Sequence, residues 1–209
     1  LLARMPRLRM SAEGIRDTML QISGLLELQM GGEPIYPPQP AGIWRHVGRN
    51  APKYETSTST NRYRRGIYVI WRRSAPYPAF TNFDAPDRTL CVVNRSRTNT
   101  PLQALTLLND PMYWEMTKAL GQDLHAIRDG GLREQVAYAF VRTVSRKPSE
   151  REIDILVELY EETVNQLTDR SKDLVALIGE KEKEVSPELG AWYYLANVLL
   201  NLDETITRN

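Results

Sequence analysis

Four well-formed helix starts constrain this chain more than any other feature of its sequence. A residue whose side-chain oxygen can cap a helix stands at Ser11, Thr100, Ser149 and Ser186. Pro101 and Pro187 follow two of these caps, at the first helical position, where the N–H that proline lacks would have no partner anyway. Glu152 lies three residues after Ser149 and completes a capping box. The sequence therefore predicts a mainly α fold.

Apolar spacing extends each of these starts into a helix. After Ser11, apolar residues recur every three or four positions up to Leu26, which predicts one buried stripe on a helix that stops at Gly31-Gly32. Asn109-Asp110-Pro111 predicts a break between two helices. The apolar stretch Ala191–Leu202 is too short and too interrupted for a membrane span, and it predicts a core helix instead.

The first half of the chain is different in kind. Residues 33–60 hold five prolines and a Ser/Thr run, which indicates a long irregular segment. Residues 62–74 fit a short strand as well as a short helix. We expect one domain over residues 1–209, in which an irregular arginine-rich half (1–97) packs on an antiparallel helical bundle (98–209), with at most a short β element.

Charge is divided along the chain, although the net charge is only +1. Residues 61–97 hold eight arginines and two aspartates, whereas residues 115–209 hold eighteen acidic and twelve basic residues. Two interpretations follow: the arginines pair with the acidic helices, or they form a ligand site. Because the whole chain is nearly neutral, we expect no nucleic-acid partner.

The arginine–aromatic cluster is the most suggestive candidate site. Guanidinium groups bind carboxylate, sulfate or phosphate bidentately, and aromatic rings stack on sugars or bases. The predicted ligand-binding residues are Arg64, Arg65, Tyr68, Trp71, Arg72, Asp84, Asp87, Arg95, Arg97 and Asn99.

Catalytic chemistry has a weaker basis in the sequence. A polar centre built from Asp84, Asp87, Arg97, Asn99 and Asn109 would suit an enzyme if these side chains converged. They are also suited to structural ion pairs and caps. The catalytic residues therefore remain unknown at this stage.

Metal, haem and thiol chemistry find little support in the sequence. His46 and His125 are isolated, and there is no Cys-x-x-Cys-His motif for attaching haem, so we expect neither a metal nor haem in this chain. Cys91 lies in the apolar run Leu90-Cys91-Val92-Val93, which favours a buried small hydrophobe over a reactive thiol.

Several motifs occur together in a fixed order. These are residues 7–17 (RLRMSAEGIRD), 63–68 (YRRGIY), 83–86 (FDAP), 97–105 (RTNTPLQAL), 108–111 (LNDP) and 200–204 (LNLDE). On these motifs the chain resembles the C-terminal domain of unknown function of planctomycete-type cytochrome c proteins. It departs from the expected pattern at Gly14 and Gly66, where alanine and serine are expected.

The resemblance implies a setting rather than an activity. Such proteins are exported, carry a haem c domain upstream of this one, and occur in settings that suggest polysaccharide breakdown. The chain, which begins with leucine, is then expected to be the C-terminal portion of a longer periplasmic or extracellular protein. Its expected partners are the upstream domains and an anionic carbohydrate, with no cofactor bound in this chain.

Three roles stay open on the sequence. The first is an accessory or ligand-binding module linked to polysaccharide utilisation, with the arginine–aromatic cluster as its site. The second is a catalytic domain with an Asp/Arg/Asn centre. The third is a structural docking domain, which an exposed apolar patch would favour.

Overall fold

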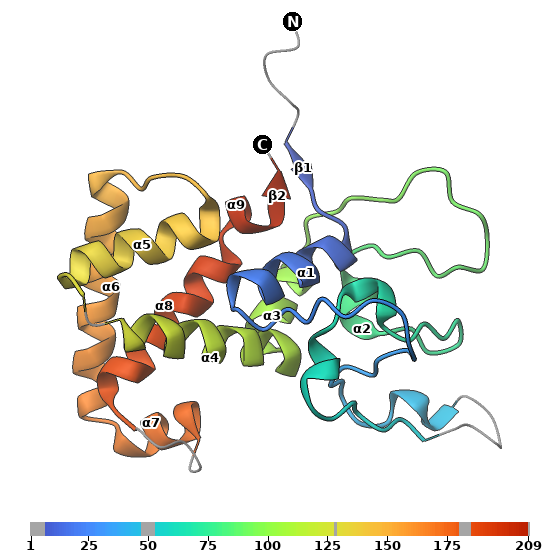
Figure 1. The fold of residues 1–209 in the computed structure, drawn as a ribbon, viewed down its shortest axis with the longest axis horizontal. Helices are drawn as coiled ribbons and strands as arrows, with labels where there is room; N and C mark the ends of the chain where they lie inside the picture. Colours follow the sequence, from blue (N-terminus) through green and yellow to red (C-terminus); the bar gives the residue numbers. More distant parts are fainter. Residues whose placement is uncertain (1–6, 47–52, 128, 180–184, 209) are drawn as a thin grey trace, which may run out of the picture. The chain divides into compact units, whose positions relative to one another are not determined.

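The computed structural model describes residues 7–46, 53–127, 129–179 and 185–208. The chain divides into two compact units, residues 1–114 with 206–209, and residues 115–205. Within the described residues the fold is mainly helical, and its one sheet pairs two short strands (Figure 1). The predicted fold class, mainly α with at most a short β element, is confirmed. The predicted division near residue 97 stays a prediction.

The first unit holds few long helices. Its elements are β1 (Leu8–Arg9), α1 (Ala12–Ile22), the 3-10 turns η1 (Ile43–His46), η2 (Thr60–Tyr63) and η3 (Gly66–Tyr68), α2 (Pro78–Asn82), α3 (Pro101–Asn109), the start of α4 (Pro111–Ala126), and β2 (Thr207–Arg208). β1 and β2 pair antiparallel, with Leu8 opposite Arg208 (Figure 1). The ambiguous stretch 62–74 forms η2 and η3 and a single parallel bridge between Ile35 and Val69.

Helix α1 starts where the cap predicts and ends earlier than predicted. Ser11 Oγ accepts a hydrogen bond from the Gly14 N–H at 3.2 Å. The predicted stop at Gly31-Gly32 is wrong, because the helix ends at Ile22. Gly24, with φ of 74°, turns the chain into the left-handed region, and the Leu25 N–H donates back to the Leu20 carbonyl at 3.0 Å.

The second unit is built from long capped helices. It contains most of α4, then α5 (Leu132–Val144), α6 (Glu150–Thr168), α7 (Ser171–Ile178), α8 (Pro187–Asn201) and α9 (Asp203–Ile206), whose last residue belongs to the first unit. α8 packs against α5, α6 and α7, and most of its residues are buried, although Tyr194 is exposed. The prediction that Ala191–Leu202 is a core helix is therefore confirmed.

Close packing explains two glycines. A Cβ at Gly121 of α4 would lie 2.6 Å from Tyr193 Cδ1 and 3.1 Å from the Trp192 carbonyl oxygen, so glycine lets α4 and α8 approach. A Cβ at Gly66 of η3 would lie 3.0 Å from Glu13 Cα. Glycine at position 66, where the resemblance leads us to expect serine, therefore matches a close contact between η3 and α1.

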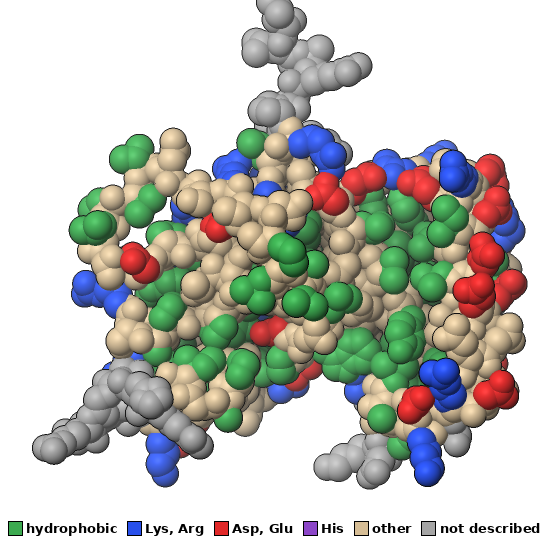
Figure 2. All heavy atoms as spheres, turned by 180° about the vertical axis from the view of Figure 1, so that it is seen from behind, with side chains coloured by type: hydrophobic (Ala, Val, Ile, Leu, Met, Phe, Trp, Pro, Cys, Tyr) green, Lys and Arg blue, Asp and Glu red, His purple; other side chains and the backbone are tan. Residues whose placement is uncertain are grey.

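Charged side chains of the second unit pair with one another. Arg133 of α5 lies 2.9 Å from Glu150 and 2.6 Å from Asp154 of α6. Figure 2 shows acidic and basic side chains lying side by side along the edge of the face that these helices form. These acidic helices thus find arginine partners within their own unit.

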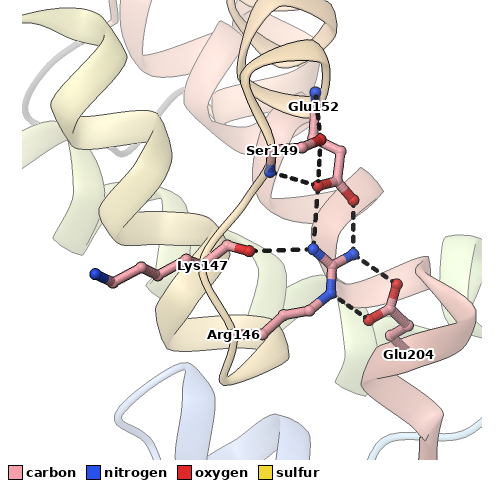
Figure 3. Close-up of polar contacts among 5 residues, drawn as sticks. All are labelled: Arg146, Lys147, Ser149, Glu152 and Glu204. Carbon is pink, nitrogen blue, oxygen red and sulfur yellow. Dashed lines mark hydrogen bonds and ion pairs between the residues drawn. The ribbon is translucent and has the colours of Figure 1, made fainter.

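Arg146 organises the largest of these ionic clusters (Figure 3). Its guanidinium bonds Glu152 at 2.6 Å and Glu204 at 2.7 Å, and Glu152 also closes the predicted capping box with Ser149. Hydrogen bonds from Arg146 and from Ser149 lower the pKa of Glu152 to about 2. The cluster joins the loop before α6 to α9.

Candidate functional site

Arg64 is buried and holds irregular backbone. Its side chain is 3% exposed, and its guanidinium donates to the carbonyls of Gln29 (3.3 Å), Glu33 (3.0 Å) and Gly31. The guanidinium also lies 3.8 Å from the centre of the Tyr68 ring, and the Tyr68 hydroxyl accepts the Gly31 N–H at 2.9 Å. Arg64 and Tyr68 therefore supply the backbone of residues 29–33 with hydrogen-bond partners that a helix or a sheet would otherwise provide.

Two further arginines of the predicted cluster have acidic partners in the same unit. Arg65 lies 3.2 Å from Asp17, and Arg95 lies 2.8 Å from Glu13, both on α1. The sequence left open whether the arginines pair with the acidic C-terminal helices. The ion pairs that these two make are instead with α1.

Trp71 and Arg72 lie against other aromatic and cationic groups. The Trp71 ring stacks on Phe80, with ring centres 6.5 Å apart, and the Arg88 guanidinium lies 4.7 Å from the centre of the Trp71 ring. Arg72 lies 4.7 Å from the centre of the Trp44 ring. These contacts make Trp71 and Arg72 parts of the packing of the irregular segment.

The predicted carboxylates cap their own loops. Asp84 accepts hydrogen bonds from the Thr98 N–H (2.7 Å) and hydroxyl (2.9 Å), and its backbone has a φ of 60°. Asp87 accepts from the Thr89 N–H at 2.9 Å, and Asn109 donates to the Leu105 carbonyl of its own helix. Because these groups are engaged locally, the geometry gives no support to the catalytic centre considered above.

Three of the predicted residues meet in one pocket. Asp84, Arg95 and Arg97 line a cavity of about 240 Å³, which we call the arginine pocket. The remaining lining residues are Arg9, Met10, Ser11, Ala12, Phe83, Val93, Asn94 and Ser96. The pocket lies where α1 begins, and Arg97 is exposed and has no hydrogen-bond acceptor among the described residues.

The electrostatics of the arginine pocket favour an anion. Three arginines and the N-terminal end of α1, whose N–H groups carry partial positive charge, surround it. Against them stand Asp84 and the nearby Glu13. Burial works to raise the pKa of Glu13, but hydrogen bonds from its own backbone and from Arg95 hold that pKa below its ordinary value. Glu13 therefore stays ionised and holds Arg95 in place.

The other predicted residues do not join this pocket. Arg64 lines a different pocket, Asn99 is exposed without a partner among the described residues, and Arg65, Tyr68, Trp71, Arg72 and Asp87 line neither of the two pockets. Sequence reasoning missed Arg9 and Ser11. The sequence did contain a signal for Arg9. This arginine lies two residues before the cap Ser11, so it adds positive charge near the positive end of α1, where an anion would be favoured.

Sequence reasoning also missed Arg16, which is buried inside the first unit. Arg16 is 1% exposed and donates to the Arg62 carbonyl at 2.6 Å, while its Nε–H has no partner among the described residues. Three tyrosines interact with its charge, and burial raises the pKa of each well above the ordinary value: Tyr54, Tyr77 and Tyr113. Arg16 lines neither of the two pockets described above.

Cys91 lies on the surface, so the prediction of a buried thiol is wrong. Leu90, Val92 and Val93 beside it are exposed as well. Residues 90–93 lie in the loop between α2 and α3 and form no helix or strand. Their apolar side chains therefore do not line up on one face that could pack against the core.

Groups of side chains that could hold a metal ion, and helices that could cross a membrane, are both absent from the part of the chain that the structure describes. No group of three or more His, Cys, Asp or Glu side chains in that part is placed to hold a metal ion. No helix in it is long and apolar enough to cross a membrane. The side chain of His46 lies outside the described part.

Comparison with known proteins gives one match. The family model described as PSD1, a protein of unknown function (DUF1553), matches residues 1–160. No curated protein and no solved structure matches the chain. The matched range covers all the pocket residues described above.

Proposed function

We propose a ligand-binding role for this chain, which belongs to the DUF1553 family of proteins of unknown function. The ligand is an acidic carbohydrate, and the arginine pocket is its site. The observation that carries the proposal is that Arg95 and Arg97, predicted from the sequence as ligand residues, line one pocket together with Arg9. Guanidinium groups recognise carboxylate and sulfate by paired hydrogen bonds.

The size and the composition of the pocket narrow the ligand. Its volume of about 240 Å³ is below that of sites for drug-sized ligands, so it suits a single acidic sugar unit of a longer chain. Arg97 supplies free N–H groups, and Arg95 keeps those not used by Glu13. Asn94 adds a neutral amide that can bind sugar hydroxyls.

The wider setting comes from the resemblance in sequence motifs. We propose that the chain is the C-terminal module of an exported protein that carries haem c in an upstream domain and serves polysaccharide utilisation. Its location would then be periplasmic or extracellular, and its partners would include the upstream domains. In this setting the module holds an acidic polysaccharide and binds no cofactor itself.

Binding to acidic oligosaccharides tests the role of the arginine pocket. We expect the 209-residue chain to bind an oligouronide or a sulfated oligosaccharide in isothermal titration calorimetry, more weakly as salt is raised. Arg97→Ala should raise the Kd about ten-fold or more, since a hydrogen bond to a charged group contributes roughly 1.5–3 kcal/mol. Arg64→Ala is unsuited to this test, because Arg64 supports the backbone.

The matched control is Arg73→Ala, which removes an exposed arginine outside the pocket. It should bind like the parent chain. Equal losses in Arg73→Ala and Arg97→Ala, or no binding of any acidic oligosaccharide at millimolar concentration, would contradict the proposal. Circular dichroism of each variant checks that it folds.

A docking role is the second candidate, and one surface favours it. On α3, Leu102, Leu105 and Leu108 are exposed, with Leu105 at 53%, and their spacing of three residues places them along one face of the helix. Figure 2 shows hydrophobic side chains gathered on the molecular surface. Exposed apolar stripes of this kind mark interaction sites more often than chance exposure does.

Replacing the central leucine tests this second candidate. Leu105→Glu should leave the chain folded, because the side chain is exposed, and should abolish co-purification with the upstream domains expressed as a separate chain. Unchanged co-purification would remove the docking role and leave ligand binding untouched.

A further inference from the structure

A second pocket, on another part of the first unit, has a different chemical character. Residues 29–35 and 57–64 enclose about 450 Å³. We call this the hydroxyl pocket, after the groups that line it: Gln29, Glu33, Ser57, Thr58, Ser59 and Asn61. Nothing in the family match assigns a role to these residues.

The walls of the hydroxyl pocket offer neutral hydrogen-bonding groups. Two amides and three hydroxyls each combine a donor with an acceptor. Arg64 also lines the pocket, but its guanidinium is committed to the carbonyls of Gln29, Gly31 and Glu33. Glu33 adds a carboxylate. The pocket therefore presents many neutral partners and the Glu33 carboxylate, beside an Arg64 guanidinium whose donors are committed to the backbone, whereas three arginines line the arginine pocket.

The backbone around the hydroxyl pocket is held firmly. The Ile35 N–H donates to the Tyr68 carbonyl at 2.8 Å, and the Ile70 N–H donates to the Ile35 carbonyl at 2.9 Å. Across the pocket, Ser57 exchanges two bonds with Tyr36, from Ser57 N–H to Tyr36 O and from Tyr36 N–H to Ser57 Oγ, both at 2.9 Å. A rigid frame of this kind reduces the entropy lost on binding.

One lining residue is held in a costly conformation. Ser59 has φ of 60° and ψ of −168°, a region that only glycine adopts readily. Ser59 lies at the start of η2, beside Thr58 in the pocket lining. Strained backbone of this kind is concentrated at binding sites and active sites.

We propose that the hydroxyl pocket binds a neutral polyhydroxylated ligand, such as an uncharged sugar unit. Each hydroxyl of such a ligand both donates and accepts, which matches amide and serine or threonine side chains. Pro34, which is exposed, supplies an apolar surface for the carbon face of the ring. Glu33 accepts from ring hydroxyls and repels acidic sugars. The inference does not depend on the role proposed for the arginine pocket.

Neutral oligosaccharides are the probes for this site. Saturation-transfer NMR and calorimetry on the 209-residue chain, with cellohexaose, xylohexaose, mannohexaose and laminarihexaose at millimolar concentration, should detect binding of at least one. Salt should leave its Kd unchanged, because no ion pair is made. The double variant Gln29→Ala/Asn61→Ala should raise that Kd about ten-fold or more.

Two matched variants separate this site from the arginine pocket. Arg97→Ala should leave neutral-sugar binding unchanged. Glu33→Gln keeps an oxygen acceptor but removes the repelling charge, so it should keep neutral binding and newly admit glucuronate. It also tests the site if the double variant fails to fold.

Several results would overturn the inference. These are no binding of any of the four oligosaccharides, unchanged affinity in the folded Gln29→Ala/Asn61→Ala variant, loss of neutral binding in Arg97→Ala, or a Glu33→Gln variant whose preference between neutral and acidic sugars is that of the parent chain.

Discussion

The two units of this chain stabilise their backbones in different ways. In the second unit the helices satisfy their own N–H and C=O groups, side chains cap the ends, and buried apolar faces hold the helices together. In the first unit long stretches have no such ladder, and side chains supply the missing partners. Arg64 binds three carbonyls and Arg16 binds two.

This difference shows that arginine has three roles in the chain. Arginine replaces secondary structure at Arg64, joins helices through carboxylates at Arg146, and lines a pocket at Arg97. Only the last leaves the guanidinium free for a ligand. The count of arginines in a segment therefore says little about binding until the partner of each is known.

Arg64→Ala should break the first unit and have the largest effect. It leaves three part-buried carbonyls without their donor, at roughly 1–3 kcal/mol each, and removes a buried side chain, so we expect a loss on the order of 4 kcal/mol in the free energy of unfolding. Urea denaturation measures the loss. Hydrogen exchange should accelerate at the Ile35 and Ile70 amides and stay slow in α8. Arg65→Ala, which removes an exposed ion pair, should cost less than about 1 kcal/mol; equal losses in the two variants would refute a structural role for Arg64.

Gly121→Ala should break the second unit through packing alone. The added methyl group would lie 2.6 Å from Tyr193 Cδ1, so α4 and α8 have to separate, at about 3 kcal/mol. Thermal and urea unfolding report the change. Gly14→Ala makes the same exchange in α1, where the nearest atom would be Ser11 Oγ at 3.3 Å. That control should be neutral or gain up to about 1 kcal/mol from helix propensity, and a similar loss in both would argue against the close approach.

Ser59→Gly should stabilise the first unit by about 1 kcal/mol, because glycine adopts the observed φ and ψ without strain. The midpoint of urea unfolding measures this gain. Ser74→Gly, at an exposed position outside the left-handed region, should lose stability through the greater freedom of the unfolded chain. If both changes destabilise, Ser59 is not strained.

Glu152→Gln should have the smallest effect, visible mainly as a change in pH dependence. The pKa of Glu152 is lowered from 4.5 to about 2 in the folded chain, so its stabilising contribution is present above pH 4.5 and is lost as the pH falls toward 2. Thermal melts between pH 7 and about 2.5 should show a smaller loss for the variant than for the parent. Glu158→Gln, an exposed acid of the same helix, should follow the parent curve. Identical curves for all three would exclude a contribution from this cluster.

The site could be predicted only in part. The sequence identified Arg95, Arg97 and Asp84 as candidates, and they line one pocket, but it grouped them with Arg64 and Trp71, which hold irregular backbone and aromatic packing. Arg9, which completes the pocket, lies 75 positions before Asp84 and 86 positions before Arg95 in the chain. No local pattern could have joined them.

Local sequence patterns alone were enough to place the starts of four helices, although they missed the short helix α2. Ser11, Thr100, Ser149 and Ser186 cap helices as predicted, since a cap and its partner lie within three residues of each other. Only the tertiary structure decided that Cys91 is exposed, that α1 ends at Ile22, and which arginines are buried. Those outcomes depend on contacts between distant segments, and the free energy of such contacts is set by burial and partners that no local pattern contains.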